Sequence, residues 1–203
     1  MNELADIPNL QGRRVTLRSL KNEDFIQWQE VRLQNHDWLT KWEPLRSPGQ
    51  KDPAKDVNAF EARCRSRQRE SQLGTGWGFG VFTDGNFIGE INLNNVTRGA
   101  FQSSHVGYWI AQDKAGNSYT PEALVVLMRF AFEELGLHRL QISIVPRNLP
   151  SRRVVEKLNL RCEGLSEKYL EIAGTWEDHL RFAVTSEEWV RRADQLVEEW
   201  IKP

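Results

Sequence analysis

The stretch Val106-Gly107-Tyr108-Trp109-Ile110, followed by Ala115-Gly116-Asn117-Ser118 and then by Thr120-Pro121-Glu122, decides the fold of this chain. The first segment is typical of a strand, the second of a tight turn, and the third of a helix start. Small residues let a ligand approach the backbone, and a helix N-terminus offers unpaired N–H groups and a positive dipole end. The pattern indicates a phosphate site, although an ordinary turn before a proline-started helix explains the same residues.

A second polar segment, residues 146–153, directly follows a predicted strand over 140–144. Within it, Asn148 and Ser151 offer hydrogen-bonding groups at the strand end, and three arginines bring positive charge. This composition suits an anionic ligand. The alternative interpretation makes Ser151 a helix N-cap and leaves the arginines solvated.

The rest of the chain predicts a mixed α and β fold. Alternating apolar residues and turn signals predict strands at 14–18, 77–82, 87–96, 105–110, 140–144, 167–172 and 176–184. Helical spacing predicts helices after a cap at Asn22, over 57–70, from 120 to a stop at Gly136, over 151–158, and beyond a capping box at Thr185 and Glu188. We expect one domain over residues 1–203, with a core at 12–184 and a C-terminal amphipathic helix in 185–203.

Composition excludes several classes of protein. Twenty-seven Lys and Arg residues oppose 28 Asp and Glu residues in a chain of 203, so tight non-specific nucleic-acid binding is not expected. The longest apolar run, residues 123–128, is too short to cross a membrane, and the start lacks a secretory signal, so we expect a cytoplasmic protein. Cys64 and Cys162 lack metal-ligand spacing; we expect two incidental thiols and no metal, with a single disulfide as the alternative.

Taken together, these segments resemble the GNAT N-acetyltransferases, specifically the RimJ/RimL type that acetylates ribosomal proteins at an N-terminal alanine. The resemblance covers about residues 12–184. Its most specific stretches are 107–110, 115–123 and 148–160, with further matches at 38–44, 137–139, 163–164 and 176–179.

The resemblance implies an α+β fold with a central, mostly antiparallel sheet, one splayed parallel strand pair and flanking helices. It places acetyl-CoA in a V-shaped opening between strands 106–110 and 140–145, and coenzyme A is then a product. The distal phosphates are expected at Arg152, Arg153 or Lys157. The residues expected to bind acetyl-CoA are Trp109, Ile110, Ala111, Gly116, Asn117, Ser118, Tyr119, Thr120, Asn148, Ser151 and Arg152.

The phosphate loop departs from the family pattern at two positions. Ala115 stands where Arg or Gln is usual, and Ser118 stands where Gly is usual. If Ser118 adopts a positive φ, its side chain costs conformational free energy. We therefore expect weakened, but not lost, cofactor binding.

The expected reaction is direct attack of a neutral amine on the thioester. An α-amino group, with a pKa of about 7.7–8.0, needs less help from a base than a lysine amine near 10.4. Glu90 is the expected base, because its strand borders the predicted acceptor site, and Glu171 is a weaker candidate. Ser151 is expected to protonate the departing thiolate, and an N–H near Ile110 to stabilise the oxyanion.

The acceptor is open at this stage. Trp38, Trp42 and Glu43 are expected to form an aromatic, acidic wall for a cationic peptide N-terminus, unless these residues simply anchor the N-terminal helices. The leading hypothesis is the N-terminus of a ribosomal protein. The alternatives are a small amine (a polyamine, amino acid or antibiotic) or a catalytically silent acyl-CoA-binding or ribosome-associated module. We expect a monomer or homodimer.

Overall fold

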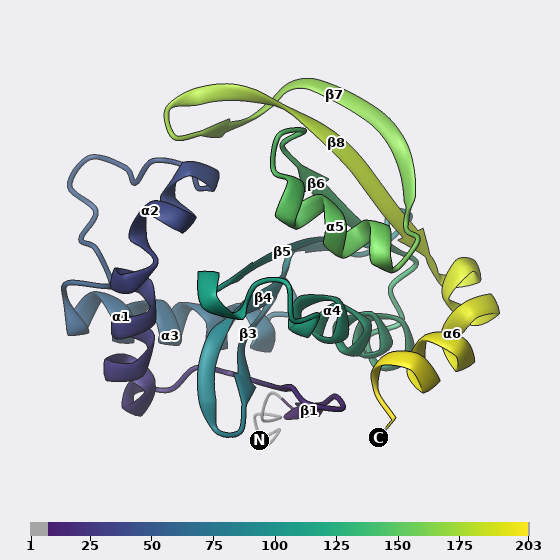
Figure 1. Ribbon diagram of the computed structural model, residues 1–203, viewed down its shortest axis with the longest axis horizontal. Coiled ribbons are helices and arrows are strands. Elements are labelled where there is room, and N and C mark those ends of the chain that lie inside the picture. The colour runs from purple at the N-terminus through teal and green to yellow at the C-terminus, as the bar shows by residue number, and fades with distance from the viewer. Residues whose placement is uncertain (1–7, 203) are drawn as a thin grey trace.

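The computed structural model describes residues 8–202, which form an eight-stranded sheet flanked by helices (Figure 1). The strands are β1 (Leu10–Gln11), β2 (Thr16–Arg18), β3 (Trp77–Thr83), β4 (Asn86–Thr97), β5 (Ser103–Ile110), β6 (Arg139–Ile144), β7 (Arg161–Ile172) and β8 (Thr175–Thr185). The α-helices are α1 (Phe25–Gln34), α2 (His36–Leu39), α3 (Val57–Gln72), α4 (Tyr119–Arg129), α5 (Leu149–Lys157) and α6 (Ser186–Trp200). Short 3-10 turns cover Asn22–Asp24, Thr40–Trp42 and Gln112–Lys114, and a π-helical turn covers Phe130–Glu134.

The sheet has the strand order β1-β2-β3-β4-β5-β6-β8-β7, and its neighbours are antiparallel except for the β5–β6 pair. The parallel pairing runs only from Ser103–Arg139 to His105–Gln141. Beyond those residues β5 still pairs with β4, and β6 with β8, while β5 and β6 separate from each other. The predicted fold class is confirmed, including the splayed parallel pair.

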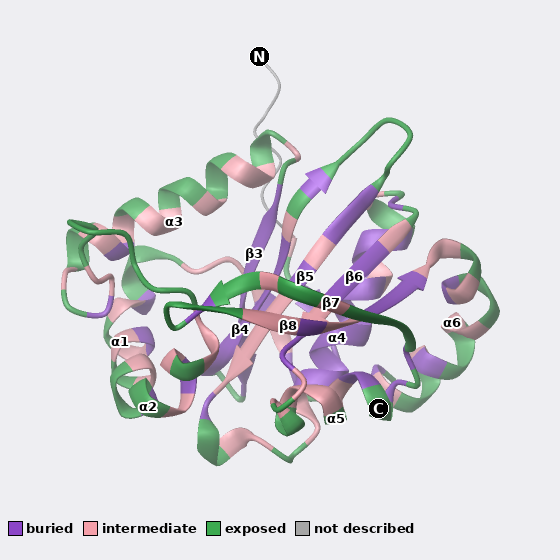
Figure 2. Ribbon diagram, turned by 90° about the horizontal axis from the view of Figure 1, so that it is seen from above, coloured by how far each residue is buried: buried purple, intermediate pink, exposed green. Residues whose placement is uncertain are grey.

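Two apolar clusters cover the two faces of the sheet. Alternation along β5 places Val106 in the larger cluster with α4 and α6, and Trp109 against the smaller cluster that contains Trp28 of α1 and Phe60 of α3. Residues 120–128 of α4 are all buried, as expected for a helix that is apolar on nearly every side. Figure 2 shows β3, β4 and β6 largely buried, β5 partly buried and partly intermediate, and β7 largely exposed.

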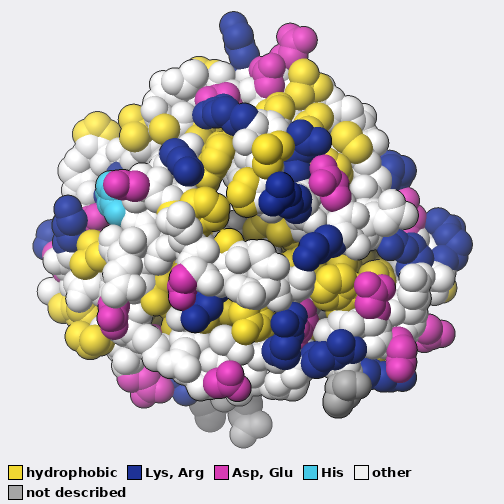
Figure 3. All heavy atoms as spheres, viewed as in Figure 1, with side chains coloured by type: hydrophobic (Ala, Val, Ile, Leu, Met, Phe, Trp, Pro, Cys, Tyr) yellow, Lys and Arg dark blue, Asp and Glu magenta, His cyan; other side chains and the backbone are white. Residues whose placement is uncertain are grey.

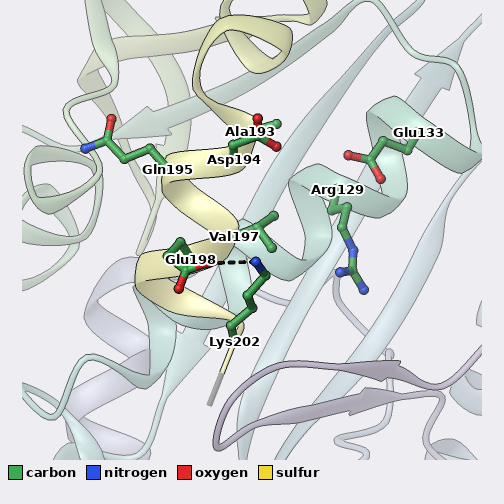
Figure 4. Close-up of a pocket in the computed structure, with 8 residues that line it drawn as sticks. All are labelled: Arg129, Glu133, Ala193, Asp194, Gln195, Val197, Glu198 and Lys202. Atoms are coloured by element: carbon green, nitrogen blue, oxygen red, sulfur yellow. Dashed lines mark hydrogen bonds and ion pairs between the residues drawn. The ribbon is translucent and has the colours of Figure 1, made fainter.

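The C-terminal helix α6 packs along α4. The predicted capping box is confirmed: the Glu188 N–H donates to Thr185 Oγ1 at 3.3 Å, and the Thr185 N–H donates to Glu188 Oε2 at 2.8 Å. Between the helices lies a groove of about 550 Å³, where Lys202 Nζ donates to Glu198 Oε2 at 2.7 Å (Figure 4). The residues that line this groove belong to the C-terminal parts of the two helices and to none of the strands.

Two helix starts differ from the prediction. Helix α5 begins at Leu149, and its N-cap is Asn148, whose Oδ1 accepts the Ser151 N–H at 3.2 Å. Ser151 therefore lies inside the helix, and the interpretation of Ser151 as an N-cap is wrong. Similarly, Asn22 lies within a 3-10 turn, and the Asp24 carboxylate accepts the Lys21 N–H at 2.7 Å before α1 begins.

Other expectations are settled within residues 8–202. Strand β7 begins six residues before the predicted start at 167, because its exposed residues give no alternating pattern. Cys64 and Cys162 are both free thiols, so the disulfide alternative is wrong. None of the helices formed by these residues combines the length and apolar character that a membrane span requires.

Candidate active site

The gap between β5 and β6 is the candidate active site. Main-chain groups alternate between the two edges of a strand, and the Ala111 N–H donates to Ile88 O of β4 at 2.9 Å. Ile110 and Tyr108 therefore direct their N–H and C=O groups toward the gap, whereas Trp109 directs its groups toward β4. The Ala111 carbonyl is also occupied, because it accepts the Lys114 N–H at 3.1 Å. Of the three predicted main-chain ligands, only Ile110 faces the opening.

A tryptophan from α2 covers the acceptor that Ile110 presents. Trp38 Nε1 donates to Ile110 O at 3.0 Å. A ligand that pairs with this carbonyl as an added strand must displace the indole.

Tyr108 and Ser151 face each other across the gap. Tyr108 Oη lies 3.2 Å from Ser151 Oγ, and it also donates to the Ser151 main-chain carbonyl at 3.2 Å. Burial raises the pKa of the Tyr108 phenol, so this hydroxyl keeps its proton at neutral pH. Sequence reasoning placed Ser151 here but missed Tyr108, whose signal was a hydroxyl on the otherwise apolar face of β5.

The turn between β5 and α4 has the geometry of an anion cradle. Gly116 and Ser118 both have positive φ values, +85° and +65°. The left-handed conformation that the sequence suggested for Ser118 is therefore confirmed. Within residues 8–202, no protein acceptor lies within hydrogen-bond distance of the N–H groups of residues 116–120. These free donors at the start of α4 suit a phosphate group.

A lysine from α5 supplies the positive charge of this cradle. Lys157 Nζ donates to Ser118 Oγ at 2.6 Å. In contrast, Arg152 turns back along its own helix, where it donates to Pro146 O and to Glu156 Oε1, each at 3.3 Å. Among the three cations left open by the sequence, the structure brings Lys157 to the loop and not Arg152. Asn148, expected at the pantetheine, uses its Oδ1 to cap α5.

Seen from outside, this region is a hollow. Figure 3 shows a recess near the centre of the face, with Lys and Arg side chains gathered beside it. The gap, the free N–H groups and Lys157 together fit a ligand with a thin polar arm and a diphosphate.

Glu90 lies on the opposite face of the sheet, next to Trp109 in the β4–β5 register. Its side chain is 2% exposed, Oε1 accepts Trp28 Nε1 at 2.6 Å, and Oε2 pairs with the Arg63 guanidinium. Both oxygens are therefore engaged. A role for Glu90 as the base stays a prediction, and it requires the ion pair with Arg63 to open.

The predicted acceptor wall is largely neutralised. Arg32 donates to both oxygens of Glu43, at 2.7 and 2.8 Å. Lys41 Nζ lies 5.1 Å from the centre of the Trp38 ring and 5.5 Å from that of Trp42. Because cations of the protein already occupy the aromatic faces and the carboxylate, this wall is poorly suited to a cationic N-terminus.

Comparison with known proteins decides the family. The acetyltransferase (GNAT) domain matches residues 14–161, which are most of the chain. The chain belongs to the GNAT acetyltransferase family.

The most similar relatives agree with this assignment. The chain is 31% identical to the probable N-acetyltransferase YjcK of Bacillus subtilis, over 86% of this chain and 96% of that protein. It is 29% identical to the ribosomal protein uS5-alanine N-acetyltransferase of Escherichia coli, over 87% and 90% of the two chains. Among solved structures, Mycobacterium smegmatis RimJ in complex with CoA-disulfide has a TM-score of 0.84 and 32% identity, covering 95% of this chain and 92% of RimJ.

These findings confirm the predicted enzyme class. The GNAT protein described here is an N-acetyltransferase, and acetyl-CoA is the cofactor of such enzymes. The gap and the cradle of free N–H groups in this chain fit that cofactor.

Proposed function

We propose that this enzyme acetylates the N-terminal α-amino group of a protein, with a ribosomal protein as the expected acceptor. Two of the similar proteins, from Escherichia coli and Mycobacterium smegmatis, carry names of enzymes of this type. The carrying observation is the Tyr108–Ser151 pair, which brings a protonated hydroxyl to the gap, while both oxygens of the proposed base, Glu90, are engaged by Trp28 and Arg63. Such a site suits an amine that loses its proton readily, and an α-amine with a pKa of about 8 does so.

Bound acetyl-CoA supplies an acetyl group activated as a thioester. The N–H groups of residues 116–120 and the Lys157 ammonium hold the negative charge of the diphosphate. The Ile110 N–H faces the gap, where it is placed to donate to an oxyanion.

Ser151 is the residue proposed to protonate the departing thiolate. Its Oγ carries a transferable proton beside the gap, and Tyr108 Oη, 3.2 Å away, fixes the direction of that hydroxyl. We assign Ser151 as the proton donor and Tyr108 as the residue that positions it. Glu90 is retained as the proposed base, acting after release from Arg63.

Intact-mass spectrometry tests the proposal. The protein is incubated with acetyl-CoA and three acceptors: a peptide that begins with alanine, the same peptide with a blocked N-terminus and an internal lysine, and free spermidine. We expect the mass of one acetyl group to be added to the first peptide alone. Acetylation of spermidine alone would favour a small-amine enzyme, and no coenzyme A release with any acceptor would favour a silent binding module.

A further inference from the structure

A second cavity lies on the sheet face opposite the cofactor cradle, and it is called here the α3 groove. It has a volume of about 690 Å³, within the range of about 300–1,000 Å³ typical of ligand sites. One wall is α3, the other is the connection from β2 to the 3-10 turn at Asn22–Asp24, and the floor consists of β3 and β4. Of the residues given a role in the proposed reaction, Glu90 alone lines this groove.

The groove contains polar groups that the protein leaves unpaired. Asn92, on the floor, is only 9% exposed, and its Oδ1 is buried without a hydrogen-bond partner among residues 8–202. Ser19 Oγ, on the facing wall, is in the same state. Burying such atoms without partners is unfavourable, so they indicate a missing ligand. A carboxamide has a donor and an acceptor side by side, which is the complement of a peptide unit.

The charge of the lining selects the kind of peptide. Glu90 is the one acidic side chain of the described residues that lines the groove. Each basic side chain of the lining has a carboxylate partner: Glu90 pairs with Arg63 inside the lining, and Asp24, Glu23, Glu61 and Glu70 pair with Arg18, Lys21, Arg65 and Arg67 from outside it. The lining itself therefore carries more basic than acidic side chains, and this excess favours acidic side chains of a ligand. The basic residues that line it are Arg18, Lys21, Arg63, Arg65 and Arg67.

The floor of the groove reaches to within one strand of the catalytic gap. Asn92 of β4 is paired with Gly107 of β5. Gly107 has no side chain to separate the groove from β5, and the next residue, Tyr108, carries the hydroxyl that contacts Ser151. The side chain of Tyr108 lies on the other face of the sheet, so a chain in the groove is separated from the reacting centre by the single strand β5.

We propose that the α3 groove binds an acidic stretch of the acceptor polypeptide, and that Asn92 pairs with one of its peptide units. This inference rests on the proposed function, because it names the class of N-terminal acceptor that the enzyme selects. It moves the acceptor away from the wall of Trp38, Trp42 and Glu43, where Arg32 donates to both oxygens of Glu43.

Peptide binding tests this placement. Two peptides begin with alanine and carry a fluorophore at the C-terminus; one has glutamates at positions three to six, and the other has lysines there. Fluorescence anisotropy is measured at low salt with coenzyme A present, so that no acetyl transfer occurs. We expect the wild-type protein to bind the acidic peptide at least tenfold more tightly than the basic one.

Variants on α3 provide a matched comparison. Arg65 lines the groove, whereas Arg69 lies on the same helix, is also exposed and does not line it. Arg65→Glu is expected to weaken binding of the acidic peptide at least tenfold, and Arg69→Glu to leave the preference unchanged. Asn92→Ala is expected to weaken both peptides equally.

Equal affinity of the wild-type protein for the two peptides overturns the inference, as does an effect of Arg69→Glu as large as that of Arg65→Glu. Coenzyme A release, measured with acetyl-CoA and the same peptides, tests the proposed function separately. If coenzyme A is released at the same rate with both peptides and both bind equally, the proposed role of the α3 groove is wrong but the proposed function stands. If the acidic peptide binds more tightly but no coenzyme A is released, the proposed function alone is wrong.

Discussion

Ser118 holds a backbone conformation, φ +65°, that is costly for a residue with a side chain, and it does so in the middle of the phosphate cradle. Its hydroxyl oxygen also accepts a hydrogen bond from Lys157 Nζ at 2.6 Å. We expect Ser118→Gly to lower the dissociation constant of coenzyme A about fivefold, because the ammonium no longer bonds to the hydroxyl and about 1 kcal/mol becomes available for the diphosphate. The strain at φ +65° is present with and without the ligand, so its relief raises the free energy of unfolding instead. Isothermal calorimetry measures this. Ala115→Gly, at an ordinary φ of −63°, is the control that should not tighten binding. An unchanged constant for Ser118→Gly contradicts the argument.

The Tyr108–Ser151 pair should act as a unit. We expect Tyr108→Phe and Ser151→Ala each to lower kcat by about ten- to a hundredfold while the KM for acetyl-CoA changes little, since each removes the same aligned proton. The double variant should be no slower than the slower single variant. Steady-state kinetics with thermal melting as a folding control decide the matter. If the fold losses in kcat of the two single variants multiply in the double variant, the two hydroxyls act independently.

Glu90 combines a proposed catalytic role with a structural one. Glu90→Gln leaves Arg63, 25% exposed, without its carboxylate, and we expect a loss of about 2 kcal/mol in the free energy of unfolding. Denaturant titration measures that loss. A base at this position predicts in addition that the fall of kcat/KM at low pH changes its midpoint. If stability falls but the pH profile keeps its shape, Glu90 is structural only.

At the scale of elements, much of the fold was predictable from local pattern. The turn at Asp84 and Gly85, both with positive φ, is where the sequence predicted a hairpin between β3 and β4. The start of β7 was missed because a strand exposed on both faces has no alternation to detect. The start of α5 was missed because Asn148 and Ser151 are both good caps, and only the hydrogen bond from the Ser151 N–H to Asn148 decides between them.

The candidate site was predictable only in part, for a physical reason. Ser118 and Ser151 were located correctly because their positions follow from the chain order of turn and helix. The main-chain N–H of Ala111 faces β4 and not the gap, because it donates to Ile88 O. No local sequence pattern reveals this pairing. Likewise, the cation that pairs with Glu43 and one that lies over the Trp42 ring come from other segments, Arg32 of α1 and Arg147 before α5.

The α2 segment links the cofactor side of the gap to the β7–β8 hairpin. Trp38 Nε1 donates to Ile110 O, and five residues later Glu43 O accepts the Ala173 N–H at 2.9 Å at the hairpin turn. Trp38→Phe removes the indole donor and frees the carbonyl, so we expect the dissociation constant of coenzyme A to fall about three- to tenfold, as a hydrogen bond worth about 1 kcal/mol no longer competes. Calorimetry measures it, and Trp42→Phe is the matched control. If the dissociation constant of coenzyme A changes equally in Trp38→Phe and Trp42→Phe, the Trp38 indole does not compete with the ligand for Ile110 O.

At the scale of the whole molecule, the catalytic gap is a consequence of how the sheet divides. One half, β1 to β5, is held by α1 and α3 on one face, and the other, β6 to β8, is joined to it by the short ladder from Ser103 to His105. The halves separate past His105, and side chains such as Tyr108 and Ser151 bridge the opening. This arrangement leaves main-chain groups of β5 unpaired in the interior, which is tolerable only where a ligand pairs with them.

The same molecule has an acid-sensitive fold, because several groups bind protons less readily when folded. Burial acts to raise the pKa of Asp24, but its bonds to Arg18 and to the Lys21 N–H outweigh this and hold the pKa below its ordinary value. Burial, and then the charges of Arg181 and Arg139, lower the pKa of His105. The other carboxyl groups with lowered pKa values, which are exposed or half-buried, are Asp56, Glu163, Glu187, Glu188 and Glu198.

The sign of the resulting pH dependence follows from proton binding. Each lowered pKa means that the unfolded chain takes up protons before the folded chain does, so stability is present at higher pH and is lost as the pH falls. We expect the melting temperature to decline in two stages, the first below about pH 6.5 from His105 and the second below about pH 4 from the carboxyl groups. Calorimetry from about pH 7.5 to about pH 3 measures both stages. His105→Gln should abolish the first, and Asp24→Asn should reduce the second, even at high salt, which screens the exposed pairs but not the buried one. A melting temperature that is constant over this range would show that these charge contacts do not persist in solution.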